Sequence, residues 1–577
     1  MSNERGGGKH PPLFRLSQGI KMTQKHKPKI LMCSEASFLH SGYGTYAKEV
    51  LTRLYNSDKY ELAEFASYGH MNDPRDKSIP WKYYPNAVRE DDQRFQEYNG
   101  NPENAFGKWR FDRVVLDFMP DIVFDIRDYW MNSYQRFSIL RPFFNWVVMP
   151  TVDSKPQQEE WLDVYMNAEA VLSYSDWGGS VLQSQTNNKI KYFGKAPPAV
   201  DLNVFRPMDK EEIRKSLGIP VEANIIGSVM RNQKRKLIPD LIESVRIFLN
   251  KCEQQKNSVG VDTYLYLHTS YPDAGWNLPS ILKEHSMGKR VLFTYLCKSC
   301  KKIHAHTFCH TIKTCPHCGQ KSATFPSVAD GVSTEQLAQV YNTFDLYVQY
   351  AICEGYGMPQ VEAASCGIPI ASVNYSAMSD LIKILNGYSI EPQRFFKELE
   401  TEAYRVFPNN DQLIFTLWTY FGIEKEKRKQ ISSQVRKLVE DNFNWDHTAD
   451  VWMKVFDNIL ANKNRKVWGS IEQEYTAQLD IEEFKSFTKS YEALKYICND
   501  RVKEPDLTNN MLSLNLLKYS DYGFVTNGMN IKKFSFQDLM NVYNKYIENK
   551  NIVKYAMSNK EILNSEDYIR YANERFS

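Results

Sequence analysis

The chain has 577 residues, of which 42% are hydrophobic and 24% are charged, so it is long enough for several domains and too apolar for a disordered protein. Its formal net charge of +3 excludes a polycation that coats nucleic acid or an anionic membrane along its whole length. No apolar run approaches the roughly 18 residues that span a bilayer. The N-terminus lacks the apolar core of a signal peptide, so we expect a cytoplasmic protein.

The first elements predict a parallel α/β layer. Residues 1–28 are polar and basic and are expected to form a flexible tail. Apolar residues at 47, 50, 51 and 54 repeat with helical spacing and predict a helix over 46–54, after a strand at 30–33 and a glycine-rich turn. Further strands are predicted at 121–126, 145–149 and 170–175. Alternating strands and helices indicate a doubly wound, Rossmann-like domain over residues 29–200.

A second domain of the same kind is predicted over residues 201–460. Its predicted strands lie at 223–229, 262–268, 290–294, 345–349 and 368–373, and its predicted helices at 237–250, 334–341, 358–366 and 425–460. Residues 461–577 are expected to form a mostly helical C-terminal extension, in which no motif can be read chemically.

The most informative stretch runs from Glu354 to Pro369. Glu354 is predicted in the loop after a strand and Glu362 in the following helix, at the edge of an open α/β sheet where ligands bind. Gly355 and Gly357 would let the backbone approach a ligand, and the N–H groups of the new helix suit a diphosphate. A carboxylate in the helix can accept both hydrogen bonds of a ribose diol. The alternative is an ordinary turn with solvated glutamates.

This stretch resembles the signature of the GT-B retaining glycosyltransferases of the GT4, or "group 1", type. Other segments match that family in order. Residues 42–44 resemble its N-terminal glycine loop, and residues 199–207 its interdomain segment. Residues 229–236 resemble its Arg/Lys phosphate clamp, and residues 442–445 the entry to the last helix, which crosses back to the first domain. The resemblance implies two facing Rossmann-like domains around one cleft.

The resemblance also implies roles for individual residues. Glu362 would bind the nucleotide ribose and Glu354 would face the transferred sugar, while Arg231 and Lys236 would stabilise the departing diphosphate without a catalytic metal. Taken alone, such a basic turn is more often a solvated loop. The donor-binding residues implied are Gly42, Tyr43, Gly44, Gly355, Tyr356, Gly357, Met358 and Glu362.

The catalytic contact from the first domain is less defined. Related transferases often present a histidine near the reacting sugar, and no histidine here matches it. Asp153 and Asp128 follow predicted strands of the first domain, and either fits the acceptor side. We take Asp153 as the catalytic candidate. For each aspartate a helix cap or turn residue is an equal alternative.

Five of the ten cysteines fall between Cys297 and Cys318. Cys297, Cys300, Cys315 and Cys318 form two C-x2-C pairs, a spacing typical of a structural Zn²⁺ site in a zinc ribbon. We expect this ribbon to be an insertion over residues 295–325. The alternative ligands are Cys309, His304, His306, His310 and His317.

The predicted ribbon is basic. Between Leu296 and Phe325 it has five lysines and no acidic residue, a charge pattern that would favour contact with nucleic acid. A purely structural module, or one that contacts another protein, is the alternative.

We therefore expect an enzyme that moves a sugar from a nucleotide-diphosphate sugar to an acceptor hydroxyl with retention. A glycan, a small molecule or a hydroxymethylated DNA base would fit as acceptor, the last requiring base flipping. Phosphorylase-like or sucrose-synthase-like chemistry on the same fold is one alternative. Another is a non-catalytic protein of this fold that uses its ribbon to bind nucleic acid or a protein partner.

Overall fold

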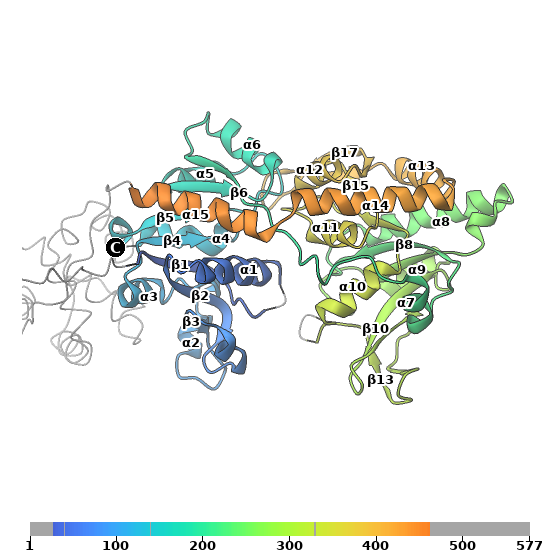
Figure 1. The fold of residues 1–577 in the computed structure, drawn as a ribbon, viewed down its shortest axis with the longest axis horizontal. Helices are drawn as coiled ribbons and strands as arrows, with labels where there is room; N and C mark the ends of the chain where they lie inside the picture. The colour runs from blue at the N-terminus through green and yellow to red at the C-terminus, as the bar shows by residue number, and fades with distance from the viewer. Residues whose placement is uncertain (1–26, 40, 139, 328–329, 462–577) are drawn as a thin grey trace, which may run out of the picture.

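The computed structural model describes residues 27–39, 41–138, 140–327 and 330–461. They form two α/β domains side by side (Figure 1). The predicted basic tail up to residue 26 and the predicted helical extension from residue 462 lie outside the described residues. No helix of the described part is both long enough and apolar enough to cross a bilayer.

The first domain is built on a parallel sheet of seven strands in the order β3-β2-β1-β4-β5-β6-β7. Its central strands are buried on both faces, as parallel strands covered by helices must be. The strands are β1 Lys29–Glu35, β2 Glu61–His70, β3 Lys82–Ala87, β4 Ile122–Asp125, β5 Asn145–Val148, β6 Ala170–Ser173 and β7 Tyr192–Lys195. The helices are α1 Gly42–Asn56, α2 Phe95–Asn99, α3 Phe111–Phe118, α4 Tyr129–Asn132, α5 Glu159–Met166 and α6 Asp176–Gln185.

The second domain repeats this plan, with parallel strands in the order β10-β9-β8-β14-β15-β16. These strands are β8 Asn224–Val229, β9 Thr263–His268, β10 Val291–Cys297, β14 Leu346–Gln349, β15 Ile370–Val373 and β16 Tyr388–Ile390. The helices are α7 Lys210–Leu217, α8 Ile238–Gln254, α9 Leu278–Glu284, α10 Thr334–Asn342, α11 Met358–Ser365, α12 Ala377–Ile384, α13 Asn410–Phe421, α14 Lys425–Asn442 and α15 Trp445–Ala461.

Short 3-10 helices cover Pro74–Ser78, Pro102–Phe106, Ser133–Phe137, Arg141–Phe143 and Ser258–Gly260. Every strand predicted from the sequence is present, and the α/β fold class with two doubly wound sheets is confirmed. The prediction omitted β2, β3, β7 and β16 at or near the sheet edges, and the two-stranded hairpin β17 Pro392–Lys397 and β18 Tyr404–Pro408.

The cysteine-rich segment grows out of the second sheet. Strand β10 continues past its parallel partner β9 and pairs antiparallel with β11 Ile303–Thr307 and β13 Lys321–Thr324, which pairs with β12 Lys313–Thr314. These strands project from one side of the domain (Figure 1). Because β10 belongs both to the parallel sheet and to these antiparallel pairs, the cysteine-rich segment is continuous with the second sheet.

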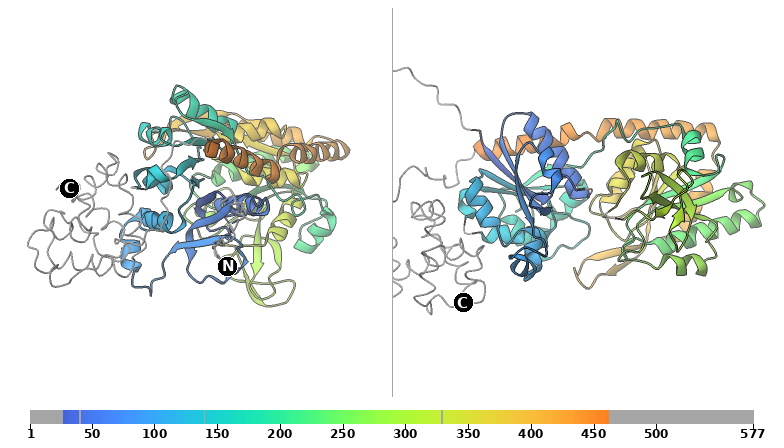
Figure 2. Two further views of the ribbon diagram at one scale, coloured as in Figure 1. Left: turned by 60° about the vertical axis from the view of Figure 1, so that its left-hand side comes forward. Right: turned by 90° about the horizontal axis from the view of Figure 1, so that it is seen from below.

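The last described helix crosses back to the first domain, as the resemblance implied. In Figure 1, α14 runs along the second domain and α15 along the first, and Figure 2 shows the same crossing from two other sides. Trp452 of α15 is fully buried, its indole N–H donates to the Tyr46 hydroxyl at 2.8 Å, and its ring lies 4.9 Å from that of Phe124. The chain therefore joins the two domains at two points, near residue 200 and near residue 443.

Candidate active site and metal centre

Two loops of the second domain meet where the strand order reverses between β8 and β14. One follows β8 and carries the basic run from Arg231 to Lys236, and the other follows β14 and carries Glu354. Both leave the carboxyl ends of neighbouring parallel strands, where ligands of open α/β sheets bind. An antiparallel backbone bridge between Lys236 and Ala351 joins the two loops.

Glu354 is buried and fully bonded. One carboxylate oxygen accepts hydrogen bonds from the Lys236 ammonium and, at 2.8 Å, from the Gln349 amide, while the other accepts from Arg235 at 2.9 Å. Its backbone N–H donates to Ser376 Oγ at 3.0 Å. Burial alone would raise the pKa of Glu354, but Arg235 and Lys236 outweigh it and hold the pKa at about 2. The carboxylate is therefore ionised at neutral pH.

This cluster carries an excess of positive charge. Glu354 supplies one negative charge against the two cations of Arg235 and Lys236. The side chains of Lys236 and Glu354 are each 8% exposed, whereas that of Arg235 is 41% exposed. An anion that enters from the cleft therefore meets a prearranged guanidinium backed by a buried ammonium.

Arg231 lies apart from this cluster. Its guanidinium grips Asp273 with Nη2–Oδ1 at 2.9 Å and Nε–Oδ2 at 3.2 Å, and its side chain is 51% exposed. The sequence singled out Arg231 and Lys236 as the clamp, but the cations that meet on Glu354 are Arg235 and Lys236. The one signal for Arg235 was its place in the same basic turn.

The basic turn is held by the loop before α9. The side chain of buried Asn232 accepts from the Trp276 backbone N–H and donates to the Trp276 carbonyl, each at 2.8 Å. The Trp276 indole donates to the Lys236 carbonyl at 2.7 Å. A Cβ at Gly275 would lie 2.4 Å from the Asn232 carbonyl oxygen, so this packing needs glycine there. The backbone from which Lys236 extends is therefore fixed before any ligand binds.

Glu362 lies on α11, one loop away. Its carboxylate accepts a 2.6 Å hydrogen bond from the Tyr341 hydroxyl, and burial raises the pKa of Glu362 to about 7. Beside it, Gln360 is fully buried, and its side-chain nitrogen and oxygen have no partner among the described residues. These polar atoms can gain hydrogen bonds from a ligand at the start of α11.

Gly355 is the point where the two domains touch at the site. A Cβ at Gly355 would lie 2.2 Å from Cγ2 of Thr151, which belongs to the first domain. The missing side chain at Gly355 thus lets Thr151 approach the backbone closely, in addition to any ligand. Gly357 has φ +102 and begins α11, so a left-handed backbone requires glycine at that position.

Tyr356 and Met358 face the protein interior. The Tyr356 side chain is buried, and its hydroxyl donates to the carbonyl of Pro198, just before the interdomain segment, at 3.0 Å. Met358 is half-buried and packs against the same core. Any contact of Tyr356 with a donor therefore falls to its backbone atoms, whereas the Met358 side chain stays partly exposed.

The segment expected to be a glycine loop in the first domain is helical. Gly42, Tyr43 and Gly44 form the first turn of α1, and the Gly44 N–H donates to the capping Ser41 Oγ at 3.1 Å. A Cβ at Gly44 would lie 2.6 Å from the Leu39 carbonyl oxygen, so this glycine serves the preceding turn of the chain itself. The prediction of a loop was wrong because Ser41 caps the helix four residues earlier than the apolar spacing indicated.

Acidic side chains of the first domain lie near the basic turn of the second. The Tyr43 hydroxyl and Thr151 Oγ1 lie 2.6 Å apart, and both groups act to lower the pKa of the neighbouring Asp128. Burial, with a smaller contribution from Asp153, raises the pKa of Asp128 to about 6, while Arg235 of the second domain pulls it down. An acidic wall thus faces a basic one.

Asp153 is bound to the second domain. One carboxylate oxygen accepts from Arg405 Nη1 at 2.7 Å and from Ser154 Oγ at 2.9 Å, and the other accepts from the Cys353 thiol at 3.3 Å. The sequence placed Asp153 on the acceptor side but contained no signal for Arg405, which is 252 residues away.

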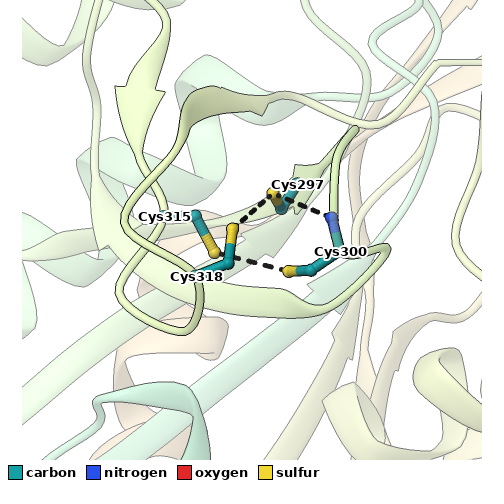
Figure 3. Close-up of side chains that lie close together, drawn as sticks. All are labelled: Cys297, Cys300, Cys315 and Cys318. Atoms are coloured by element: carbon teal, nitrogen blue, oxygen red, sulfur yellow. Dashed lines mark hydrogen bonds between the residues drawn. The ribbon is translucent and has the colours of Figure 1, made fainter.

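The four cysteines predicted as metal ligands lie together at the end of β10 (Figure 3). Their Sγ atoms are all within 4.8 Å of one another, and Cys297–Cys318 and Cys300–Cys315 are each separated by 3.7 Å. Four thiolates at about 2.3 Å from a tetrahedral zinc would be about 3.8 Å apart, whereas a disulfide requires about 2.0 Å. The spacing therefore fits a metal ion and not a disulfide.

Two matching turns present these thiols. In each turn, the residue after the second cysteine has a left-handed backbone: Lys301 has φ +58 and Gly319 has φ +73. The N–H of that residue donates to the carbonyl of the first cysteine, from Lys301 to Cys297 and from Gly319 to Cys315, both at 2.9 Å. The Cys300 N–H also points at Cys297 Sγ, at 3.5 Å. Such N–H groups stabilise thiolates.

The alternative ligands are not in this group. Among the described residues the metal-ligand cluster contains only the four cysteines. His317 bonds the Ile303 carbonyl at 3.0 Å, and His304 is buried with its ring stacked on Tyr295.

We predict that Gly355→Ala forces the domains apart at Thr151. The added Cβ would overlap Thr151 Cγ2, and such overpacking costs about 1–3 kcal/mol of unfolding free energy. Thr151→Ser removes that methyl group but keeps the hydroxyl, so the double variant should recover most of the loss. Chemical unfolding of the four proteins measures this. Equal destabilisation of Gly355→Ala with and without Thr151→Ser would contradict it.

Part of the chain matches a known protein family. The model of the family "Glycosyl transferases group 1" matches residues 327–400, which include Glu354 and Glu362. No curated protein matches the sequence.

Similar solved structures extend over most of the chain. Sucrose-phosphate synthase from Thermosynechococcus elongatus has a TM-score of 0.53 at 16% identity and covers 76% of this chain and 100% of its own. A glycosyltransferase from Rickettsia africae has a TM-score of 0.52 at 14% identity, with coverage of 76% and 100%. HepE from Anabaena, solved with UDP and glucose, has a TM-score of 0.50 at 14% identity, with coverage of 75% and 100%. The chain therefore has the GT-B fold of these glycosyltransferases, and the segment matched by the group 1 family model includes the loop that carries Glu354 and the helix that carries Glu362.

Proposed function

We propose that this protein is a glycosyltransferase that moves a sugar from a nucleotide-diphosphate sugar to an acceptor hydroxyl, with retention at the anomeric carbon. The observation that carries the proposal is Glu354, ionised between Arg235 and Lys236 at the switch point of a GT-B sheet. The match of the group 1 family model to residues 327–400 supports it.

The donor would lie along the second domain. Glu362 would accept hydrogen bonds from the ribose hydroxyls, and the first N–H groups of α11 would face the diphosphate. Arg235 and Lys236 would neutralise that diphosphate, with Arg231 at the rim of the site. Backbone atoms of residues 355–358 would line the donor, and Glu354 would face the transferred sugar.

Cleavage of the sugar–phosphate bond would depend on the positive charge of Arg235 and Lys236. As the sugar–phosphate bond breaks, negative charge accumulates on the nucleoside diphosphate, and the excess positive charge of the cluster would stabilise it without a catalytic metal. Glu354 has hydrogen bonds on both oxygens and a low pKa, which makes it a weak nucleophile. This favours attack by the acceptor from the same face over a double displacement.

The acceptor would enter against the first domain. Asp128 and Asp153 line that wall and can accept hydrogen bonds from a hydroxyl group. The contact of Thr151 with Gly355 would keep water from the reacting centre. A glycan or a small polyol fits such a wall, because phosphate groups would be repelled from it.

We predict that nucleotide binding strengthens as the pH rises through about 7. The ribose diol needs an ionised Glu362, and burial holds the pKa of that carboxyl at about 7, so below it affinity should fall by up to about tenfold per pH unit. Calorimetric titration of UDP, GDP and ADP between pH 5.5 and 8.5 measures this.

Glu362→Gln is the matched control for that titration, because the nucleotide phosphates titrate in both proteins. It should bind the best nucleotide more weakly and lose the part of the pH dependence due to the protein. The absence of binding of all three nucleotides, or an unchanged profile in Glu362→Gln, would refute the assignment.

We also propose that the four-cysteine centre holds one structural Zn²⁺. Four thiolates fill a tetrahedral sphere and leave no open position for catalysis. Reduced thiols at this spacing also favour a reducing compartment such as the cytoplasm. The ion would supply the stability that a ribbon of short strands lacks.

Elemental analysis should find about one zinc per chain. Cys315→Ser should lower zinc content and the thermal midpoint, because metal binding contributes directly to folding. Cys309→Ser should leave both unchanged, since Cys309 lies outside the cluster. A fully folded metal-free protein would rule the zinc site out.

A second candidate function is nucleic-acid contact through the ribbon. Lys298, Lys301, Lys302 and Lys321 are exposed, and no acidic residue lies among them in the segment. Counterion release would then supply affinity for phosphates. This would allow a modified DNA base as acceptor, or a non-catalytic protein that docks on nucleic acid.

Changing Lys298, Lys301 and Lys302 to Gln should lower the salt slope of duplex DNA binding by about 3, one for each phosphate contact. The matched control is the same change at Lys425, Lys427 and Lys429 on α14, which are also exposed. Duplexes with and without hydroxymethylcytosine test the acceptor. No binding, or equal losses in both triple variants, would remove this candidate.

A further inference from the structure

The hairpin β17–β18 follows the main sheet of the second domain in sequence but bonds to both domains. The Tyr404 N–H of β18 donates to the Lys155 carbonyl of the first domain at 2.8 Å. Two residues on, the Val406 N–H donates to the Ile352 carbonyl in the loop that carries Glu354, at 3.3 Å. One strand thus connects the first-domain loop after β5 with the second-domain loop after β14.

Arg405 lies between these two backbone contacts. Its Nη1 is 2.7 Å from Asp153 of the first domain and 3.0 Å from Cys353 Sγ, while Nε and Nη2 are 3.0 and 2.7 Å from Glu398 on the hairpin. The Arg405 side chain is only 7% exposed. A single guanidinium therefore joins three segments of the chain.

The energetics of this contact make it sensitive to the distance between the domains. A buried cation needs carboxylate partners, and Arg405 has one on each side, Asp153 in the first domain and Glu398 on its own hairpin. Burial alone would lower the pKa of Arg405, but the carboxylates of Asp153 and Glu398 raise it and keep the guanidinium charged. Separation of the two domains would break the Arg405–Asp153 pair.

The contact also reaches the candidate active site. Cys353, which accepts from Arg405 and donates to Asp153, directly precedes Glu354. The planar guanidinium has donors pointing in different directions, so it can hold these acceptors at fixed angles, which an ammonium cannot.

We propose that Arg405 is a positioning residue and that the β17–β18 hairpin is an interdomain strap. The strap holds Asp153 on the first-domain wall in register with the loop of Glu354 on the second. The claim that the hairpin links the two domains does not depend on the function of the protein. The claim that Arg405 affects catalysis rests on the proposed glycosyl transfer.

The structural part is tested on the full chain without ligand, by small-angle X-ray scattering. Arg405→Gln should increase the radius of gyration, since the Asp153 carboxylate loses its partner across the cleft. Glu398→Gln, which removes only the hairpin's own carboxylate, should leave it unchanged. Lys397→Gln, an exposed change on the same hairpin, controls for lost charge. Identical scattering from Arg405→Gln and wild type would overturn the strap.

The catalytic part is tested by hydrolysis of the best nucleotide sugar from a panel of UDP-, GDP- and ADP-sugars. Arg405→Lys keeps the charge and should fold. We expect its kcat to fall by about tenfold or more with KM within about twofold, because donor contacts stay intact while Asp153 and Glu354 lose their register. A raised KM at unchanged kcat would overturn positioning. If wild type hydrolyses no nucleotide sugar, the proposed transfer fails and the scattering result still decides the strap.

Discussion

The arrangement of the site depends on one buried carboxylate, Glu354, held between two cations. A carboxylate at this depth would be protonated without Arg235 and Lys236, and a lone buried lysine would lose its charge. Each group therefore stabilises the charged form of the other. The triad is assembled from loops after two neighbouring strands, so the fold of the sheet brings it together before any ligand binds. Its excess positive charge is what an anionic leaving group needs.

The contact between the domains follows from the same loop. Gly355 lets Thr151 of the first domain pack directly on the backbone next to Glu354. Cys353, on the other side of Glu354, takes part in the Asp153–Arg405 pair. Both flanks of Glu354 are thus fixed by the first domain. The contact between the domains and the geometry of Glu354, Arg235 and Lys236 therefore depend on the same loop. Helix α15 also connects the second domain to the first, because Trp452 packs against the first domain.

The sequence predicted the central strands because they are buried on both faces and read as apolar runs. It missed strands at or next to the sheet edges, whose composition is mixed. It located the cysteine centre because each pair of ligands is close in sequence and has a recognisable C-x2-C spacing. It did not single out Arg235, because nothing local shows which cation of a basic turn reaches Glu354, and it gave no sign that the preceding turn leaves no room for a side chain at Gly44. Arg405 had no local signal at all, because its partner Asp153 is distant in sequence.

We propose above all that Glu354, Arg235 and Lys236 together cleave a nucleotide sugar with retention. The most direct measurement is proton NMR of the first sugar that full-length protein releases from UDP-, GDP- and ADP-sugars, compared with Lys236→Ala. We expect that the released sugar initially has the anomeric configuration of the donor, and that Lys236→Ala slows release by about a hundredfold or more. Initial release of the opposite anomer, or equal rates from the two proteins, would contradict it.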